Sequence, residues 1–173
     1  LVTVNHQSLI ATKAHRVVQE AKGRPVMEFG ARRAQGYDSA TYGARAAYIG
    51  GVAGTATVSA GEMFDIPVVG TMAHSFVQSF DSEYEAFKAY ALTYPDDCVL
   101  LVDTYDTLKS GVPHAIEIAK EVLEPMGKKL KGIRLDSGDI SYLSKRARAM
   151  LDVAGLTYVS ISASNSLDEY LIR

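Results

Sequence analysis

Residues 99–104 read VLLVDT and residues 132–136 read GIRLD, and these two runs decide the fold class. Each is largely apolar up to an aspartate, as is typical of strands that helices cover on both faces. Asp136 follows Asp103 by 33 residues, about the length of one strand–helix unit with a parallel return. Between them, apolar residues recur at helical spacing, at Val112, Ile116, Ala119, Leu123 and Met126. The sequence therefore predicts an α/β fold with a parallel sheet.

The same rhythm continues on both sides of this unit. Ser82 and Glu85 form a capping box that predicts the start of a helix, and Pro95 predicts its end. Further strands are predicted at 26–29, 66–71 and 157–163, and helices at 5–22, 38–50, 82–94, 112–126, 140–154 and from 166 onward.

A parallel sheet of this kind can stay open and doubly wound, or close into a (β/α) barrel. The chain has no G-x-G-x-x-G after its first strand and no G-x-x-x-x-G-K-[ST], the usual signatures of nucleotide-binding open sheets. Polar residues instead follow strand after strand, as in barrel enzymes. Because five or six strands are fewer than the eight of a full barrel, we expect residues 1–173 to form one incomplete (β/α) barrel domain with parallel strands. Starting at Leu1, the chain is expected to be an excised piece of a longer protein.

Charge and composition exclude several classes of partner. Eighteen Lys and Arg against twenty Asp and Glu give a net charge of −2, which supplies no general field for nucleic acid. No run approaches the roughly 20 apolar residues that a membrane span needs. The single cysteine, Cys98, and the lack of a basic-then-apolar leader favour a reducing, cytoplasmic location. No Cys or His spacing predicts a structural zinc.

The first cluster of candidate site residues follows the strand at 26–29. Arg32 and Arg33 could bind a phosphate or a carboxylate bidentately, or they could be surface charges. Phe29, beside them, could belong to the core or stack on a ligand ring.

Two further clusters follow the strands at 66–71 and 99–104. His74 lies between the hydroxyls of Thr71 and Ser75, where an imidazole could act as base or nucleophile near neutral pH, or be structural. Asp103 and Asp106 could share a divalent cation, bind sugar hydroxyls or cap the following helix.

The fourth cluster follows the strand at 132–136. Arg134 alternates with apolar neighbours, which predicts a buried guanidinium that needs an anionic partner, from the protein or from a ligand. Asp136 could take a pair of ribose hydroxyls, and Asp139 is expected to cap the next helix.

Taken together, five motifs in order along the chain resemble the nicotinate phosphoribosyltransferase family, which is a type II phosphoribosyltransferase. These motifs are EFGARRAQG (28–36), GTMAHSF (70–76), LVDTYDT (101–107), GIRLDSGD (132–139) and SASNSLDEYLI (162–172). The resemblance implies an irregular α/β barrel and an NAD-salvage enzyme that works as a homodimer. It implies condensation of nicotinate with phosphoribosyl pyrophosphate to nicotinate mononucleotide and pyrophosphate, with ATP hydrolysis.

The resemblance also implies residue roles. His74 matches the histidine that ATP phosphorylates, and Phe29 matches the aromatic that stacks on the pyridine ring. Arg32 matches an arginine that contacts substrate phosphate. The remaining roles are substrate binding by Thr71 and Ser75, nicotinate and ribose binding by Arg134, ribose binding by Asp136, and a position near Mg²⁺-pyrophosphate for Asp103 or Asp106.

Several alternatives remain beside this reading. The nicotinamide-specific relatives carry an aspartate in G-T-D-T-V, where this chain has Ala56, which favours nicotinate. A quinolinate phosphoribosyltransferase would need more basic residues, and a Schiff-base lyase or aldolase would need a lysine at a strand end. In the family, an N-terminal domain precedes this region and a Gly-rich phosphate loop follows SASNSLDEYLI, and the resemblance leads us to expect that residues 1–173 lack both. We therefore expect this piece to be inactive alone, or to act only as a binding piece.

Overall fold

The apolar runs at 99–104 and 132–136 form neighbouring strands of a parallel sheet. In the computed structural model, which describes residues 1–173, β3 (Val99–Leu101) pairs with β4 (Gly132–Leu135), and β4 pairs with β5 (Ser160–Ala163). All pairs are parallel, in the register Val99↔Gly132 and Gly132↔Ser160. This confirms the α/β fold with parallel strands, whereas closure into a barrel stays a prediction.

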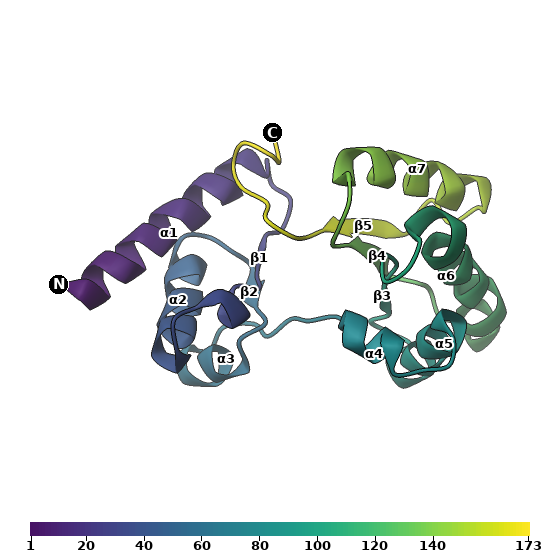
Figure 1. The fold of residues 1–173 in the computed structure, drawn as a ribbon, viewed down its shortest axis with the longest axis horizontal. Coiled ribbons are helices and arrows are strands. Elements are labelled where there is room, and N and C mark those ends of the chain that lie inside the picture. Colours follow the sequence, from purple (N-terminus) through teal and green to yellow (C-terminus); the bar gives the residue numbers. More distant parts are fainter. The chain divides into compact units, whose positions relative to one another are not determined.

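The chain divides into two compact units, and the sheet β3–β5 belongs to the unit formed by residues 71–165. In Figure 1 its helices α5, α6 and α7 flank the strands. Ser82 caps α5 by accepting from Glu85 N at 3.2 Å, and Asp139 caps α7 by accepting from Tyr142 N at 2.9 Å. Both N-caps are confirmed, and the bond of the predicted capping box that runs from Glu85 N to Ser82 is the one present. The helical elements of this unit are α4 (His74–Gln78), α5 (Glu83–Thr93), η2 (Thr107–Gly111), α6 (Val112–Ile118), η3 (Ala119–Leu123), η4 (Glu124–Met126) and α7 (Ile140–Val153).

The core of this unit forms where the strands meet the helices. Its largest fully buried side chains include Phe87, Leu100, Ile118, Ile133 and Leu151. Cys98, at the entrance to β3, is buried among them, and burial raises the pKa of its thiol to about 12. The thiol therefore packs as a small apolar group.

The other unit comprises residues 1–70 and 166–173. Its two short strands, β1 (Met27–Glu28) and β2 (Gly54–Thr55), pair in parallel. Ion pairs join the C-terminal segment to α1 (Val2–Glu20): Lys13 contacts Glu169, and Arg173 lies 3.3 Å from Glu20. The remaining elements are η1 (Ala31–Arg33), α2 (Tyr37–Ile49) and α3 (Val58–Phe64).

Two predicted elements are wrong. The strand predicted at 66–71 is reduced to a single bridge between Thr55 and Val68. The helix predicted from 166 onward is a turn, in which the Asp168 carboxylate accepts from the backbone N–H groups of Tyr170 and Leu171. Asn165 and Ser166 precede it with positive φ values of 80° and 53°, which the right-handed helix does not accommodate. The structure divides the chain into two compact units, and their union in one partial barrel domain over residues 1–173 stays a prediction.

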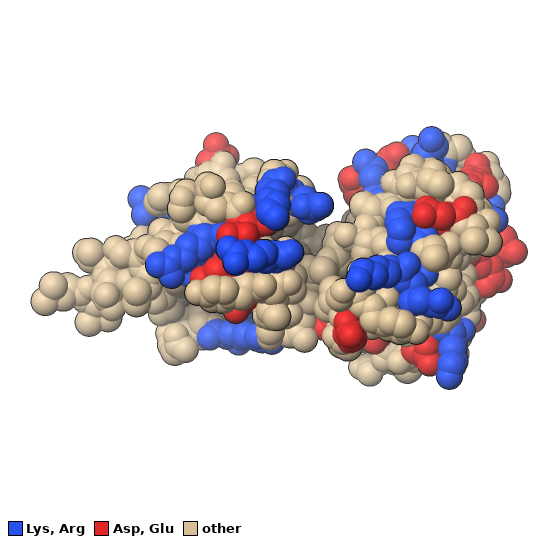
Figure 2. Space-filling model, turned by 90° about the horizontal axis from the view of Figure 1, so that it is seen from above, with Lys and Arg blue, Asp and Glu red and all other residues tan.

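Charged side chains of both signs lie on the face of each unit that Figure 2 shows. On the face seen in Figure 2, Lys and Arg lie among Asp and Glu over each unit, and no broad area has a single sign. This distribution agrees with the small net charge of −2. None of the helices has the length and hydropathy that crossing a membrane requires.

A substitution at Gly111 tests the packing of η2 against Val102, the residue that follows β3. A Cβ atom at this position would lie 1.8 Å from the carbonyl oxygen of Val102, so the backbone itself would have to move. We expect Gly111→Ala to lower the free energy of unfolding by about 3 kcal/mol in urea titrations. Gly70→Ala is the control, because a Cβ there meets nothing within 4 Å, and it should change stability by less than about 0.5 kcal/mol. Equal stability of the two variants would contradict this packing.

Candidate active site

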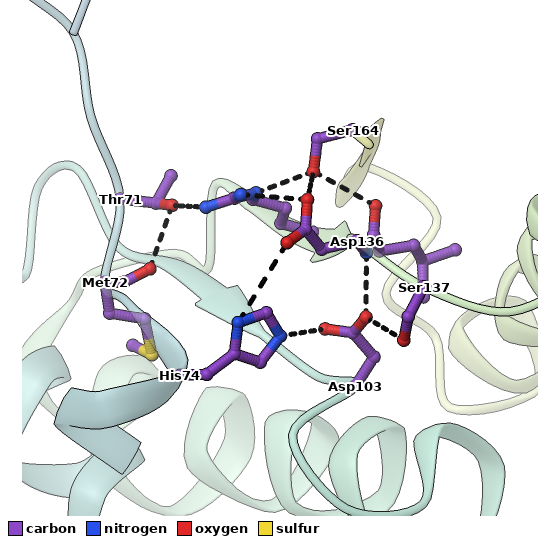
Figure 3. Close-up of polar contacts among 9 residues, drawn as sticks. Thr71, Met72, His74, Asp103, Asp136, Ser137 and Ser164 are labelled. Carbon is purple, nitrogen blue, oxygen red and sulfur yellow. Dashed lines mark hydrogen bonds and ion pairs between the residues drawn. The ribbon is translucent and has the colours of Figure 1, made fainter. Parts of the chain in front are cut away.

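Polar side chains distant in sequence meet at the carboxyl ends of β3, β4 and β5. His74 opens α4, Asp103 follows β3, Arg134 lies in β4 and Asp136 follows β4 directly. Because parallel strands present their carboxyl ends at one edge, residues about one strand–helix unit apart come together there. Figure 3 shows the resulting network, which Thr71 and Ser164 complete.

The His74 imidazole lies between two carboxylates. Its Nε2 is 3.2 Å from Asp103 Oδ1, and its Nδ1 is 4.0 Å from Asp136 Oδ2. The His74 side chain is 37% exposed, whereas those of Asp103 and Asp136 are 1% and 11% exposed. The ring is therefore accessible to a ligand, while the carboxylates on either side of it are withdrawn from solvent.

Asp103 is fixed by the loop that follows β4. Its Oδ2 accepts from the backbone N–H of Asp136 at 2.9 Å and from the hydroxyl of Ser137 at 2.5 Å. With the His74 contact on Oδ1, both oxygens of this buried carboxylate have hydrogen-bonding partners. The orientation of the imidazole thus depends on the register of β3 and β4.

The Arg134 guanidinium is 14% exposed and has its anionic partner within the protein. Its Nη2 donates to Asp136 Oδ1 at 3.1 Å, its Nη1 to Thr71 Oγ1 at 2.8 Å and its Nε to Ser164 Oγ at 2.9 Å. The prediction that this buried charge requires an anion is confirmed, with Asp136 in that position. Thr71 anchors the segment before α4 to β4.

The pKa of Asp136 reflects opposing influences. Burial alone would raise it, but a hydrogen bond from Ser164 and the positive charge of Arg134 outweigh burial, aided by His74. The pKa of Asp136 is therefore held below its ordinary value, which keeps this carboxylate ionised in the site.

The other predicted site residues lie outside this network. Ser75 is exposed in α4, and Asp106 caps η2 by accepting from the backbone N–H groups of Leu108 and Lys109. Phe29 and Arg32 belong to the other unit, at the end of β1 and in η1, where Phe29 is 37% exposed.

Sequence reasoning missed two serines of the network. Ser137 and Ser164 lie within the quoted motifs GIRLDSGD and SASNSLDEYLI, but neither was selected as a site residue. The available signal was their position one or two residues after a strand. Asp103 and Asp136 also follow strands of this parallel sheet, so side chains at these positions are expected to lie near the two carboxylates.

The protein groups alone do not form a metal site. No three His, Cys, Asp or Glu side chains are grouped to hold an ion. The oxygens of Asp103 are engaged by His74, Asp136 N–H and Ser137, and Asp106 Oδ1 by two backbone N–H groups. A role for Asp103 or Asp106 near Mg²⁺-pyrophosphate therefore stays a prediction.

Comparisons with known proteins agree on one family. The model of the nicotinate phosphoribosyltransferase (NAPRTase) family matches residues 25–171. The chain is 55% identical over 169 residues to nicotinate phosphoribosyltransferase of Bacillus subtilis (strain 168), covering 98% of this chain and 34% of that protein.

Two solved structures are similar over nearly the whole chain. Human nicotinic acid phosphoribosyltransferase matches with a TM-score of 0.80 and 31% identity, over 96% of this chain and 44% of the human chain. Nicotinate-nucleotide pyrophosphorylase from Pyrococcus furiosus matches with a TM-score of 0.81 and 32% identity, over 96% of this chain and 43% of the other. The chain spans about a third of the length of the curated relatives it matches. By the extent of these matches, the chain belongs to the nicotinate phosphoribosyltransferase family.

Proposed function

We propose that this chain forms part of the catalytic centre of a nicotinate phosphoribosyltransferase of NAD salvage. The full-length enzyme would join nicotinate to phosphoribosyl pyrophosphate and release nicotinate mononucleotide and pyrophosphate. Family membership supports this proposal, and the observation that carries it is the His74 imidazole between the carboxylates of Asp103 and Asp136. ATP as co-substrate, Mg²⁺ carried by the pyrophosphate substrate and a homodimeric enzyme are parts of the same proposal.

The reaction needs charges held in place around the sugar. The bond between C1 of the ribose and the pyrophosphate oxygen breaks, pyrophosphate leaves with the electron pair, and the pyridine nitrogen forms the new bond to C1. Positive charge develops on the ribose, so an ionised carboxylate near the sugar stabilises the transition state. Asp136 suits this role, because its pKa is held low and Arg134 and Ser164 fix its position.

Coupling to ATP would proceed through His74. If Nε2–H donates to Asp103, the Nδ1 lone pair is available to attack the γ-phosphorus of ATP, and ADP is the leaving group. Phosphohistidine next to Asp136 would bring negative charge beside the sugar site, and hydrolysis by water would remove it as phosphate. The buried Asp103 acts in this scheme by holding the ring, as the carboxylate does in other His-based sites.

Replacing His74 tests the phosphohistidine. Asn retains a polar side chain but cannot carry the phosphoryl group, so His74→Asn in the full-length enzyme should reduce ATP-stimulated turnover by about 100-fold or more. Radiolabel from γ-labelled ATP that survives alkaline denaturation should disappear with it. His15→Asn, in the exposed surface of α1, is the matched control and should behave as wild type. Undiminished ATP stimulation in His74→Asn would rule out this role.

Replacing Ala56 tests the choice of base. Ala56 is exposed directly after β2, and a carboxylate there would repel nicotinate and accept a hydrogen bond from an amide. We expect Ala56→Asp to shift the ratio of kcat/KM from nicotinate toward nicotinamide by about tenfold or more. Ala53→Asp places the same charge at the opposite end of β2 and should leave the ratio unchanged. A wild-type preference for the amide would overturn the assignment of nicotinate.

The low pKa of Asp136 gives the protein a defined pH dependence of stability. Because its pKa is lower folded than unfolded, ionised Asp136 stabilises the fold above the unfolded value of about 4, and this contribution is lost as the pH falls through the folded value. The difference in unfolding free energy between wild type and Asp136→Asn should therefore be largest near neutral pH and shrink in acid. Urea titrations from neutral pH to about pH 3 measure it, with the exposed Asp97→Asn as control. A difference that stays constant with pH would contradict the assigned pKa shift.

A further inference from the structure

The carboxylate of Glu28, at the end of β1, joins two strand-end loops. It accepts from the backbone N–H of Gly30, from the Thr55 hydroxyl at 2.5 Å and from the Thr57 hydroxyl at 3.4 Å. Gly30 belongs to the loop after β1, whereas Thr55 and Thr57 belong to β2 and to the loop that follows it. The Glu28 side chain thus forms hydrogen bonds with residues of both loops.

Backbone contacts place Phe29 and Ala56 at equivalent points of these loops. Glu28 pairs with Thr55 in the parallel ladder, and Phe29 and Ala56 are the residues that follow each partner. The Ala56 N–H donates to the carbonyl oxygen of Glu28 at 2.9 Å, and the Thr57 N–H donates to Thr55 Oγ1 at 2.9 Å. The residues on either side of Phe29 and Ala56 are therefore held both by main-chain hydrogen bonds and by the Glu28 carboxylate.

The threonines that form these hydrogen bonds are more buried than Phe29 and Ala56. Thr55 is fully buried and Thr57 is 8% exposed, while Phe29 and Ala56 face outward, Phe29 with 37% of its surface exposed. Glu28 itself is half-buried. The carboxylate thus contacts the loops on their buried side, and the exposed side chains of Phe29 and Ala56 remain accessible to a ligand.

The chemistry of these contacts favours a carboxylate at position 28 and a glycine at position 30. All three partners donate, and an ionised carboxylate is an acceptor only, so its bonds to them are charge-assisted. A Cβ atom on Gly30 would lie 2.9 Å from Glu28 Oε1, so the glycine permits the close approach of this oxygen.

We propose that Glu28 is a positioning residue for binding of the pyridine base, which it serves by holding Phe29 and Ala56 in their mutual arrangement without touching the base. This inference rests on the proposed function, in which Ala56 determines the choice of base and Phe29 takes the position of the aromatic residue that stacks on the pyridine ring in the family. Since an error of about 1 Å in a ligand-positioning group is costly, loss of the carboxylate weakens the interaction with nicotinate more than that with phosphoribosyl pyrophosphate.

The test compares Glu28→Ala and Glu28→Gln in the full-length enzyme. Glu28→Ala should raise the KM and the calorimetric Kd for nicotinate about tenfold, while the KM for phosphoribosyl pyrophosphate changes less than about twofold. Glu28→Gln should restore nicotinate binding to within about threefold of wild type, because its carbonyl oxygen can still accept from Gly30 and its amide can donate to Thr55. Glu62→Ala, an exposed glutamate of α3 in the same unit, is the matched control and should behave as wild type.

If Glu28→Ala does not fold, a second variant still tests the proposal. Gly30→Ala leaves Glu28 and the buried Thr55 in place but forces the carboxylate away from the loop after β1, so it should raise the nicotinate KM by about threefold. Nicotinate binding in either Glu28→Ala or Gly30→Ala equal to that of Glu62→Ala would overturn the role of Glu28, as would equal rises in KM for both substrates. A wild-type enzyme that neither binds nor converts nicotinate would overturn the proposed function itself.

Discussion

The buried Asp103 carboxylate is the contact on which the arrangement of the site depends. Its side chain is almost inaccessible, so leaving this charge without partners would be strongly destabilising. His74, the Asp136 backbone N–H and Ser137 supply those partners from two separate segments. Satisfying one charge therefore fixes the imidazole, the end of β4 and the following loop relative to one another.

The Arg134–Asp136 pair extends this constraint toward β5 and the segment before α4. Two buried opposite charges attract, but the desolvation that each suffers offsets much of the gain, so the pair contributes more to orientation than to stability. Ser164 contacts both partners and Thr71 contacts Arg134, so each of the three guanidinium nitrogens has a hydrogen-bonding partner. Such fixed charges need little reorganisation when a reaction develops charge of its own.

The predictable parts of the molecule are those determined by local sequence. Apolar runs and caps such as Ser82 and Asp139 identified β3, β4, α5 and α7, because each signal acts within a few residues. The apolar run at 66–71 predicted a buried strand, but only Ile66 is buried, Val68 is about half exposed, and Val68 alone forms a bridge, to Thr55. Ser137 and Ser164 were missed because a serine has no distinctive pattern, and its role depends on which carboxylate the sheet brings near it.

The two units use the same physical device at their strand ends. In the unit of residues 71–165, Asp103 accepts from a backbone N–H and a hydroxyl of the loop after the neighbouring strand. In the other unit, Glu28 accepts from a backbone N–H of its own loop, from the hydroxyl of Thr55 at the end of its partner strand and from the hydroxyl of Thr57 in the loop that follows. A parallel ladder aligns its strand ends but leaves the loops beyond them without ladder hydrogen bonds, and an acceptor-only carboxylate at that point replaces the missing bonds. The fold thereby holds His74, which contacts Asp103, in one unit, and Phe29 and Ala56, which follow Glu28 and its partner Thr55, in the other. A ligand therefore does not have to supply the free energy of ordering these residues.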